Sequence, residues 1–408
     1  GGMLTYGIPS FKLEKDVIEA EVEVIRLMGA EFRHGVEVGR DVTLDELREQ
    51  GFKAFYVAIG CQGGRLAGIP GEDAEDVTVA VDFLREVNSG KIDALLGRTI
   101  VVGGGNVAID VARNACRLGS EHVEMFCLES EAQMPASEEE RREAIEDGAH
   151  ISCGWGPKEV HLDDAGRVCG ITFKRCTRVF DDEGRFAPEY DENDLRRVDA
   201  DRVVMSIGQS IVWGDLLAGS KVELGRGQGA LADPQTYQTA EPDIFVGGDV
   251  YTGPSFAIDA IAAGHEAAVS IHRFVQPGST LTIGRNQRRY TALDRDDVVI
   301  ESYDNASREV ARVDREREKA APFSEYVETF TEEQVRAETA RCLGCGASIV
   351  DPNKCIGCGL CTTKCAFDAI HLDRDRPECS TMVKYEQKLP SLGKYALKRA
   401  IKIKFGKK

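Results

Sequence analysis

The sequence predicts an α/β protein in which two nucleotide-binding domains are interleaved and a small cysteine-rich domain follows them. Three observations predict this fold. A strand runs through glycines into a helix near position 100, other buried-type strands end in glycine on both sides of it, and six cysteines lie within the 24 residues 342–365. The 408 residues suffice for two or three domains with hydrophobic cores.

The composition is that of a glycine-rich α/β protein, with 42 glycines and a hydrophobic fraction of 42%. We find no signal peptide and no apolar run that could span a bilayer, and we therefore expect a cytoplasmic protein without a transmembrane segment. The net charge of −18 disfavours nucleic acid and anionic membranes as partners. In such a protein, 13 cysteines favour metal or redox roles over disulfides.

The central glycine motif indicates a Rossmann-like site for a dinucleotide. The strand that begins at Thr99 leads into Gly103, Gly105 and Ala108, which fill the pattern G-x-G-x-x-G/A, and helix 106–118 follows. The first glycine allows the tight turn, the second lets the main chain approach a pyrophosphate, and the small third residue lets helix and strand pack closely. The helix N-terminus offers free N–H groups to a phosphate.

The second strand of this unit, 123–127, indicates which nucleotide binds. Glu129 follows it and lies 21 residues beyond Ala108, where an acidic residue accepts a hydrogen bond from the ribose 2′-hydroxyl of NAD. A carboxylate there repels the 2′-phosphate of NADP, and no arginine lies between Val123 and Glu140 to offset it. We therefore expect NADH rather than NADPH, the alternative being that Glu129 points to solvent.

A second nucleotide-binding region is indicated by further strands that end in glycine. Two such strands end at Gly60 and Gly208, and a third ends at Gly248 and Asp249. The aspartate can hydrogen-bond a ribityl hydroxyl, and the helix that starts after Ser255 can face a pyrophosphate. We therefore expect these five residues to belong to a second cofactor site.

The C-terminal cysteines have the spacing of iron–sulfur ligands. A C-x2-C pair precedes the run C-x2-C-x2-C-x3-C of bacterial ferredoxins, with Ala366 in place of the usual proline, and one more cysteine follows. The seven expected ligands are Cys342, Cys345, Cys355, Cys358, Cys361, Cys365 and Cys379. A zinc ribbon is the alternative, but it would leave Cys361 and Cys365 unexplained.

The number of clusters is open, because two [4Fe–4S] clusters need eight ligands and this region offers seven cysteines. Either two clusters bind with one ligand that is not a cysteine or comes from a partner, or one cluster binds and some thiols are spare. We favour two, because in two-cluster ferredoxins the fourth cysteine of the run serves the other cluster. The remaining cysteines lack ligand spacing, and we expect them to be buried small apolar residues: Cys61, Cys116, Cys127, Cys153, Cys169 and Cys176.

Together, the nucleotide-binding stretches resemble the FAD-dependent pyridine-nucleotide oxidoreductases, and among them the family of the glutamate synthase small subunit. The resemblance covers roughly residues 1–275 and rests on five short stretches: Gly1–Pro9, Ile69–Gly71, Val102–Asp110, Met134–Ala136 and Gly247–Val250. It implies the following cofactor contacts: Gly248 and Asp249 with FAD, and Gly103, Gly105, Asn106 and the adjoining Val107 with the nicotinamide cofactor. It also implies hydride transfer from the nicotinamide to flavin N5.

Three departures from the family matter. Family members usually carry arginines after the second strand of the NADP unit, where this chain has Leu128, Glu129 and Glu131. The iron–sulfur module follows the flavin fold here, whereas many relatives place theirs before it. The N-terminal strand and glycine motif for the ADP part of FAD are absent from the sequence. Either the sequence is a fragment of a longer polypeptide, which we favour, or the missing half comes from elsewhere.

The interleaving predicts five parts of the chain. The expected limits are 1–97 and 208–275 for an FAD-binding-type domain that is incomplete at its N-terminus, 98–207 for an NAD(P)-binding domain, 276–330 for a charged linker, 331–383 for a ferredoxin-like iron–sulfur domain, and 384–408 for a basic tail. Nine residues of the tail are basic and its apolar residues recur at roughly helical spacing. The tail is therefore either a solvated end or a docking helix for an acidic partner.

We expect a subunit that passes electrons between NADH, FAD and [4Fe–4S] clusters, and to or from a partner such as a ferredoxin, a synthase, a reductase or an electron-bifurcating complex. The flavin is needed because nicotinamides transfer electron pairs and clusters transfer single electrons. The alternative is a non-catalytic assembly subunit in which only the clusters conduct. A dithiol reductase is disfavoured, because the nucleotide-binding segments contain no C-x-x-C.

Overall fold

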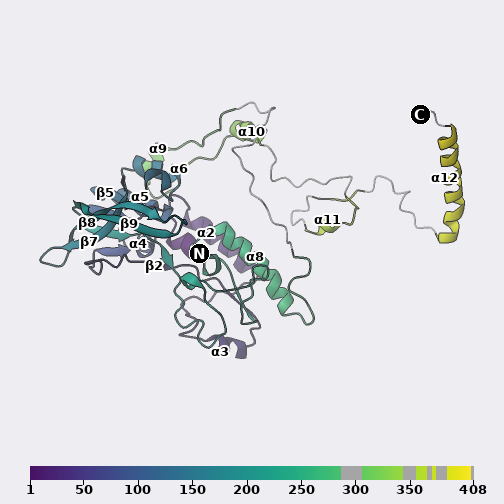
Figure 1. Ribbon diagram of the computed structural model, residues 1–408, viewed down its shortest axis with the longest axis horizontal. Helices are drawn as coiled ribbons and strands as arrows, with labels where there is room; N and C mark the ends of the chain where they lie inside the picture. The colour runs from purple at the N-terminus through teal and green to yellow at the C-terminus, as the bar shows by residue number, and fades with distance from the viewer. Residues whose placement is uncertain (286–305, 343–354, 365–369, 374–383, 406–408) are drawn as a thin grey trace. The chain divides into compact units, whose positions relative to one another are not determined.

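The computed structural model describes residues 1–285, 306–342, 355–364, 370–373 and 384–405 (Figure 1). The chain divides into two compact units, Gly1–Val335 and Arg336–Lys408. Within the described ranges, no helix is both long enough and apolar enough to cross a membrane.

The first unit is organised around a five-stranded parallel sheet. From one edge to the other, its strands are β3 (Val77–Val79), β10 (Arg202–Met205), β4 (Arg98–Val102), β5 (His122–Cys127) and β6 (His150–Cys153). Both faces of this sheet are covered, which explains why β4 and β10 consist almost entirely of buried apolar residues. β3 lies before residue 98, so the sheet includes a strand from outside the expected limits of the NAD(P)-binding domain.

Helices cover one face of this sheet and an antiparallel sheet covers the other. Val101 and Met125 belong to a core shared with the helices α4 (Ala80–Asn88), α5 (Asn106–Arg117) and α6 (Glu138–Glu146). Their chain neighbours Ile100 and Phe126 point the opposite way, as strand geometry requires, into a core shared with β7 (Trp155–Leu162), β8 (Val168–Phe180) and β9 (Phe186–Val198). There, Phe126 stacks on Phe173 with ring centroids 3.9 Å apart.

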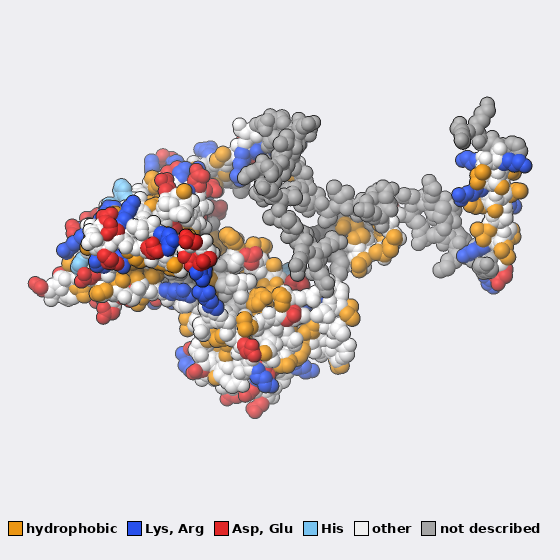
Figure 2. Space-filling view, in the orientation of Figure 1, with side chains coloured by type: hydrophobic (Ala, Val, Ile, Leu, Met, Phe, Trp, Pro, Cys, Tyr) orange, Lys and Arg blue, Asp and Glu red, His pale blue; other side chains and the backbone are white. Residues whose placement is uncertain are grey.

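The segments on either side of the inserted domain come together although they lie far apart in the sequence. β1 (Phe55–Val57) and β12 (Ile244–Val246) pair in parallel, and β2 (Gly63–Gly64) and β11 (Gln209–Ser210) pair antiparallel. This part also contains α1 (Met3–Tyr6), α2 (Lys15–Leu27), α3 (Leu44–Glu49), α7 (Asp249–Thr252) and α8 (Ala257–Phe274). Ile258 and Ile261 of α8 stay more than half exposed, and apolar side chains gather over this helix in Figure 2.

Residues 312–328 form a strap that packs on the first unit, although they belong to the stretch in which composition indicates only a charged linker. The strap contains α9 (Arg315–Ala320) and is closed by a bridge between Val313 and Val327. Tyr326 is buried, and its hydroxyl accepts a hydrogen bond from the fully buried Arg113 of α5. The guanidinium of Arg117 donates to the carbonyl oxygen of Pro322 at 2.8 Å.

Three further helices follow the strap. α10 (Glu332–Ala340) begins after Thr331, whose hydroxyl accepts a hydrogen bond from the main-chain N–H of Gln334 at 3.3 Å. The second unit contains α11 (Leu360–Lys364) and α12 (Tyr385–Phe405), so the predicted basic tail is helical over the residues described there. Two short 3-10 helices lie at Glu131–Gln133 and Arg226–Gln228 of the first unit.

Candidate functional site

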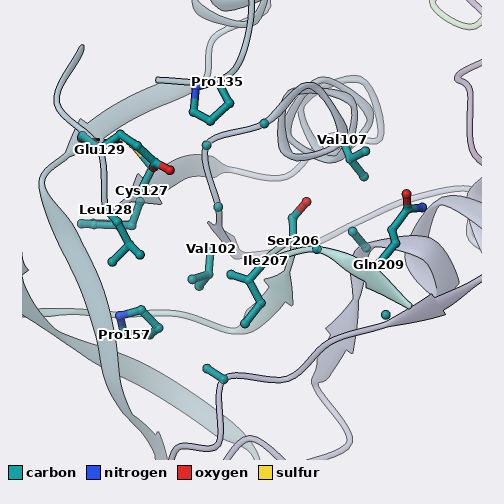
Figure 3. Close-up of a pocket in the computed structure, with 18 of the residues that line it drawn as sticks. Val102, Val107, Cys127, Leu128, Glu129, Pro135, Pro157, Ser206, Ile207 and Gln209 are labelled. Atoms are coloured by element: carbon teal, nitrogen blue, oxygen red, sulfur yellow. Dashed lines mark hydrogen bonds between the residues drawn. The ribbon is translucent and has the colours of Figure 1, made fainter. Parts of the chain in front are cut away.

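A cavity of about 680 Å³ opens at the carboxyl ends of β4, β5 and β10, where parallel sheets of this kind bind their ligands (Figure 3). Its wall is formed mainly by the segments that leave these strands, namely 102–107, 126–129 and 206–209. Of the residues that the sequence assigns to the nicotinamide cofactor, Gly103, Gly105, Asn106, Val107 and Glu129 line this cavity.

The glycine turn 103–105 fits a ligand whose phosphates touch the main chain. Gly103 has a φ of +140°, and a Cβ there would lie 2.2 Å from the carbonyl oxygen of Ser206, so a side chain is excluded. A Cβ at Gly104 would lie 2.8 Å from the Cβ of Cys127. A Cβ at Gly105 would meet nothing within 4 Å, so this part of the turn is open to a ligand.

Helix α5 begins directly at this turn. Gly105 is its N-cap and contributes no capping side chain, which leaves the first N–H groups of the helix available to a phosphate. The side-chain oxygen of Asn106 accepts a hydrogen bond from the main-chain N–H of Ser137 at 3.1 Å and thereby fixes the neighbouring loop. Val107 is half-buried at the cavity, whereas Ala108 is fully buried in the core beneath it.

Glu129 lies at the end of β5 and against the glycine turn. A Cβ at Gly104 would lie 3.1 Å from its Oε2, and its half-buried side chain lines the cavity (Figure 3). Its main chain is fixed, because the N–H of Gly154 donates to its carbonyl oxygen at 2.9 Å. This carboxylate is therefore held beside the turn that would receive the phosphates.

The sequence did not indicate the residues that complete the walls. Trp155 lines the cavity, and the guanidinium of Arg175 lies 5.1 Å from the centroid of its indole. Arg175 and Arg178 line a neighbouring cavity of about 320 Å³, which Leu128 lines as well. Both arginines come from β8, beyond the stretch 123–140 in which arginines are absent. The alternation of β8 indicates a strand, but only the tertiary fold brings it to the end of β5.

The residues expected to contact FAD gather at the end of β12. Gly248 has a φ of +66°, and a Cβ there would lie 3.3 Å from the Cβ of Ala260, so a side chain would be strained. Oδ1 of Asp249 accepts a hydrogen bond from the N–H of Ser255 at 3.3 Å, which orders the turn before α8. A glycine, a carboxylate and the start of an 18-residue helix fit the polyol and pyrophosphate of a flavin nucleotide.

The other two glycines of this predicted site lie in different places. Gly60 has a φ of +69° and precedes Cys61, whose sulfur lies 3.8 Å from the carbonyl oxygen of Asp249, so the ends of β1 and β12 adjoin. Gly208 instead lines the nucleotide cavity, together with Gln209 of β11. Gly208 therefore lies where the chain leaves the inserted domain.

The structure describes four of the seven expected cluster ligands. Cys342, Cys355 and Cys358 are exposed and Cys361 is half-buried, whereas Cys345, Cys365 and Cys379 lie outside the described residues. Among the described residues, no group of three or more side chains is arranged to hold a metal. Cluster ligation and cluster number therefore stay predictions.

The six other cysteines were expected to be buried. Cys61, Cys127 and Cys176 are buried, and the expectation is too strong for the others, because Cys116, Cys153 and Cys169 are half-buried.

A glycine turn at the switch from strand to helix, beside a cavity at the carboxyl ends of a parallel sheet, is typical of a dinucleotide-binding protein. The comparison with protein families agrees: residues 3–264 match the model of the pyridine nucleotide-disulphide oxidoreductases, and residues 348–371 match a 4Fe-4S binding domain. The first match covers more than half of the chain. The protein thus belongs to the pyridine nucleotide-disulphide oxidoreductase family, and the predicted resemblance is confirmed.

Named relatives support the same grouping. The chain is 33% identical over 358 residues to the β subunit of an NADP(+)-dependent formate dehydrogenase of Moorella thermoacetica, which covers 85% of this chain and 49% of the relative. It is 34% identical over 295 residues to the small chain of the NADPH glutamate synthase of Escherichia coli K12, and this match covers 68% of this chain and 61% of the relative. It is 31% identical over 277 residues to subunit PreT of the NAD-dependent dihydropyrimidine dehydrogenase of the same strain, and this match covers 68% of this chain and 60% of the relative.

The chain therefore spans about half to three fifths of the lengths of these relatives. Among solved structures it resembles FprA of Mycobacterium tuberculosis, here a His57Gln mutant, with a TM-score of 0.54 and 19% identity. That match covers 66% of this chain and 75% of FprA. At this identity it concerns the fold alone, and the predicted α/β architecture is confirmed.

Proposed function

We propose that this protein is a subunit that passes electrons between NADH, FAD and [4Fe–4S] clusters, and to or from a partner enzyme or a ferredoxin, including within an electron-bifurcating complex. The observation that carries the proposal is the open glycine turn in the cavity of about 680 Å³, in a chain that also contains a 4Fe-4S binding domain. The named relatives are a β subunit, a small chain and a subunit PreT, which supports a partner subunit.

For the dinucleotide, we propose that its pyrophosphate contacts Gly105 and the first N–H groups of α5. In this proposal Gly103 and Ala108 act indirectly: Gly103 keeps the turn tight, and Ala108 keeps the helix close to the sheet. The ribose of the adenosine half then reaches the carboxylate of Glu129, which accepts from its hydroxyls.

NADH is the preferred nucleotide in this proposal. Glu129 lines the cavity itself, whereas Arg175 lines the neighbouring one, so the negative charge is nearer to a bound ribose. Two of the named relatives are NADP- or NADPH-dependent and one is NAD-dependent by name, so both nucleotides occur among relatives. Glu129 and Arg175 are therefore the residues on which the preference depends.

For FAD, the chain contributes Gly60, Gly248, Asp249 and Ser255. When bound, FAD supplies the step between transfer of an electron pair and transfer of single electrons. Gly248 lets the main chain come close to the ligand, and the carboxylate of Asp249 can accept from a polyol hydroxyl. Phe256 caps α8 without a side-chain hydrogen bond, which leaves N–H groups for a phosphate.

For the C-terminal part, we propose two clusters held by the seven cysteines and one further ligand of another kind. The match of residues 348–371 to a 4Fe-4S binding domain supports iron–sulfur rather than zinc. The basic helix α12 would dock on an acidic surface of the partner, because lysines and one arginine recur along its exposed length. The domain limits expected from the sequence remain part of this proposal, with β3 added to the nucleotide-binding sheet.

The test is an anaerobic titration of the purified protein with NADH and then NADPH, followed by its visible spectrum. We expect flavin absorption above a broad iron–sulfur shoulder, bleached by NADH at much lower concentration than by NADPH. A shoulder without flavin absorption or response to either nucleotide would favour the assembly subunit instead. Iron analysis in the same sample separates two clusters from one, because two clusters hold twice the iron.

A further inference from the structure

Two cysteine sulfurs lie next to each other behind the nucleotide cavity. Cys127 is the last residue of β5 and Cys153 is the last residue of β6, and the two residues face each other in the parallel register. Their Sγ atoms are 3.7 Å apart. Cys127 is buried and lines the nucleotide cavity, whereas Cys153 is half-buried and lines two other cavities.

This arrangement is close to that of a disulfide. A disulfide needs Cα atoms about 4.4–6.8 Å apart and a sulfur–sulfur bond of about 2.05 Å. Neighbouring strands of a sheet run about 4.8 Å apart, so paired residues already meet the first condition. Rotation of the two side chains and a small shift of the strand ends would close the remaining gap, because the sulfurs start 3.7 Å apart.

One of these two strand ends forms part of the wall of the nucleotide site, because Cys127 and Glu129 line that cavity. A Cβ at Gly104 would lie 2.8 Å from the Cβ of Cys127 and 3.1 Å from Oε2 of Glu129, so the turn, the thiol and the carboxylate are in direct contact. The carbonyl oxygen of Glu129 also accepts from the N–H of Gly154, the residue after Cys153. A movement of Cys127 toward Cys153 would therefore shift Glu129 and the glycine turn together.

We propose that Cys127 and Cys153 are a thiol–disulfide switch that small-molecule disulfides of the glutathione class oxidise, and that its closure weakens binding of the dinucleotide. The inference rests on the proposed dinucleotide site. Binding and oxidation are linked in both directions, so a bound dinucleotide also shifts the thiol–disulfide equilibrium toward the two free thiols.

The chemistry starts at Cys153, which reaches solvent through its cavities. Its thiolate attacks one sulfur of the disulfide, that sulfur–sulfur bond breaks, and one glutathione leaves as a thiolate. Cys127 then attacks the sulfur of Cys153, the protein disulfide forms, and the second glutathione leaves, while the thiol protons pass to the two leaving thiolates. Two protein thiols are oxidised and one glutathione disulfide is reduced. Burial raises the pKa of the Cys127 thiol, so it reacts as the second partner.

The test uses the full chain, with cofactors as purified, equilibrated anaerobically in glutathione buffers from fully reduced to fully oxidised. After free thiols are alkylated, trypsin releases Cys127 in peptide 118–141 and Cys153 in peptide 143–158, and mass spectrometry without reductant detects whether the two are joined. The dissociation constant of NADH is measured on the same samples. We expect the joined peptides to appear with oxidation and the dissociation constant to rise about tenfold, by loss of one charged hydrogen bond.

Two variants control the assignment. Cys153→Ser should bind NADH normally and keep that affinity in oxidised glutathione, whereas Cys169→Ser, which changes a half-buried cysteine on β8, should still switch. Absence of the joined peptides in oxidised wild-type protein, or an unchanged NADH affinity once they have formed, overturns the switch. Failure of the reduced protein to bind either NADH or NADPH would count against the dinucleotide site instead, because the peptides are detected independently of the nucleotide.

Discussion

Replacing Glu129 by glutamine should reverse much of the nucleotide preference. Glutamine keeps the size of the side chain and one hydrogen-bond acceptor but removes the charge beside the glycine turn. A hydrogen bond to a charged group contributes about 1.5–3 kcal/mol and a neutral one about 1 kcal/mol, so kcat/KM with NADH should fall about tenfold. For NADPH, two unit charges about 5 Å apart at an effective dielectric constant of about 20 repel by about 3 kcal/mol. Removal of that repulsion should raise kcat/KM with NADPH by up to about 100-fold.

The assay is anaerobic reduction of an artificial two-electron acceptor by NADH and by NADPH, compared as the ratio of the two kcat/KM values. Glu131→Gln is the matched control, because Glu131 is exposed two residues further along and does not line the nucleotide cavity. Arg175→Ala gives the opposite perturbation and should lower activity with NADPH more than with NADH, since its guanidinium lies beside Trp155. If Glu129→Gln leaves the ratio unchanged while Arg175→Ala alters it, Glu129 does not read the ribose and the preference for NADH is refuted.

Four other substitutions test the glycine turn, the strap and the expected cluster ligands. Gly105→Ala should leave the urea midpoint of unfolding unchanged, because its φ of −91° suits alanine and a Cβ has open space, yet it should weaken NADH binding at least about tenfold. Gly103→Ala should instead destabilise the fold by about 3 kcal/mol or more. An equal loss of stability in both variants would contradict this difference. Tyr326→Phe should cost about 1–2 kcal/mol of unfolding free energy in urea, because Arg113 loses a buried acceptor, and a midpoint equal to wild type would show that the strap is not held there. Cys358→Ala should lower the iron content and the reduction of one-electron acceptors by NADH while leaving flavin bleaching intact; unchanged iron content would remove Cys358 from the ligands.

The parts of the site that could be predicted are local in sequence. The strand, the glycine turn and helix α5 follow one another within residues 98–117, so periodicity and the glycine spacing were enough to predict them. Glu129 could be predicted from its distance along the chain from Ala108. By contrast, β3 has only three residues and pairs with β10 more than 120 residues later, so no local pattern identifies it as part of the sheet. Trp155 reaches the nucleotide cavity, and Arg175 the neighbouring one, through a three-stranded antiparallel sheet whose packing is a tertiary property.

The strap shows a different limit of composition. Residues 312–328 are mostly charged, and a charged stretch normally indicates solvated chain, yet a buried tyrosine fixes it. The sequence could not reveal this, because the partner is Arg113, an arginine in the middle of a helix whose other buried residues, apart from Asn114, are apolar. Ion pairs of Arg113 with Glu143 and Asp147 compensate for its burial, and the phenyl ring of Phe11 lies 4.8 Å from its guanidinium carbon.

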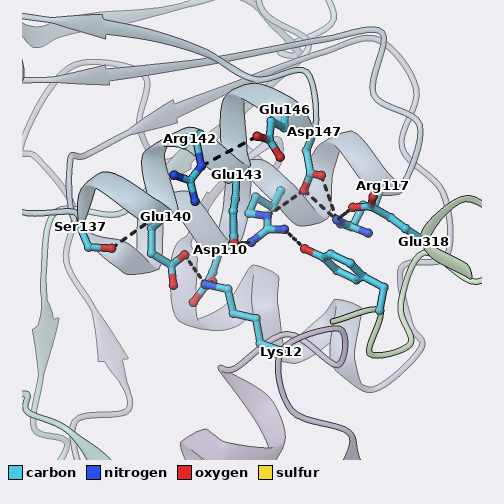
Figure 4. Close-up of polar contacts among 12 residues, drawn as sticks. Lys12, Asp110, Arg117, Ser137, Glu140, Arg142, Glu143, Glu146, Asp147 and Glu318 are labelled. Atoms are coloured by element: carbon cyan, nitrogen blue, oxygen red, sulfur yellow. Dashed lines mark hydrogen bonds and ion pairs between the residues drawn. The ribbon is translucent and has the colours of Figure 1, made fainter. Parts of the chain in front are cut away.

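Helix α5 thereby connects three parts of the first unit. Its first residue borders the glycine turn, and Arg113 and Arg117 in its second half hold the strap. Asp110, which lies between the glycine turn and Arg113, pairs with Lys12 at 2.6 Å (Figure 4). Burial raises the pKa of Asp110 to about 6, although the charges of Lys12 and, less strongly, of Arg113 oppose that shift and favour the ionised carboxylate. A buried charged cluster of this kind is costly when incomplete, since each remaining charge loses its partner. The cluster therefore favours one arrangement of α5, the N-terminal segment and the strap, and any displacement of α5 by a dinucleotide at its N-terminus would have to be shared by all three.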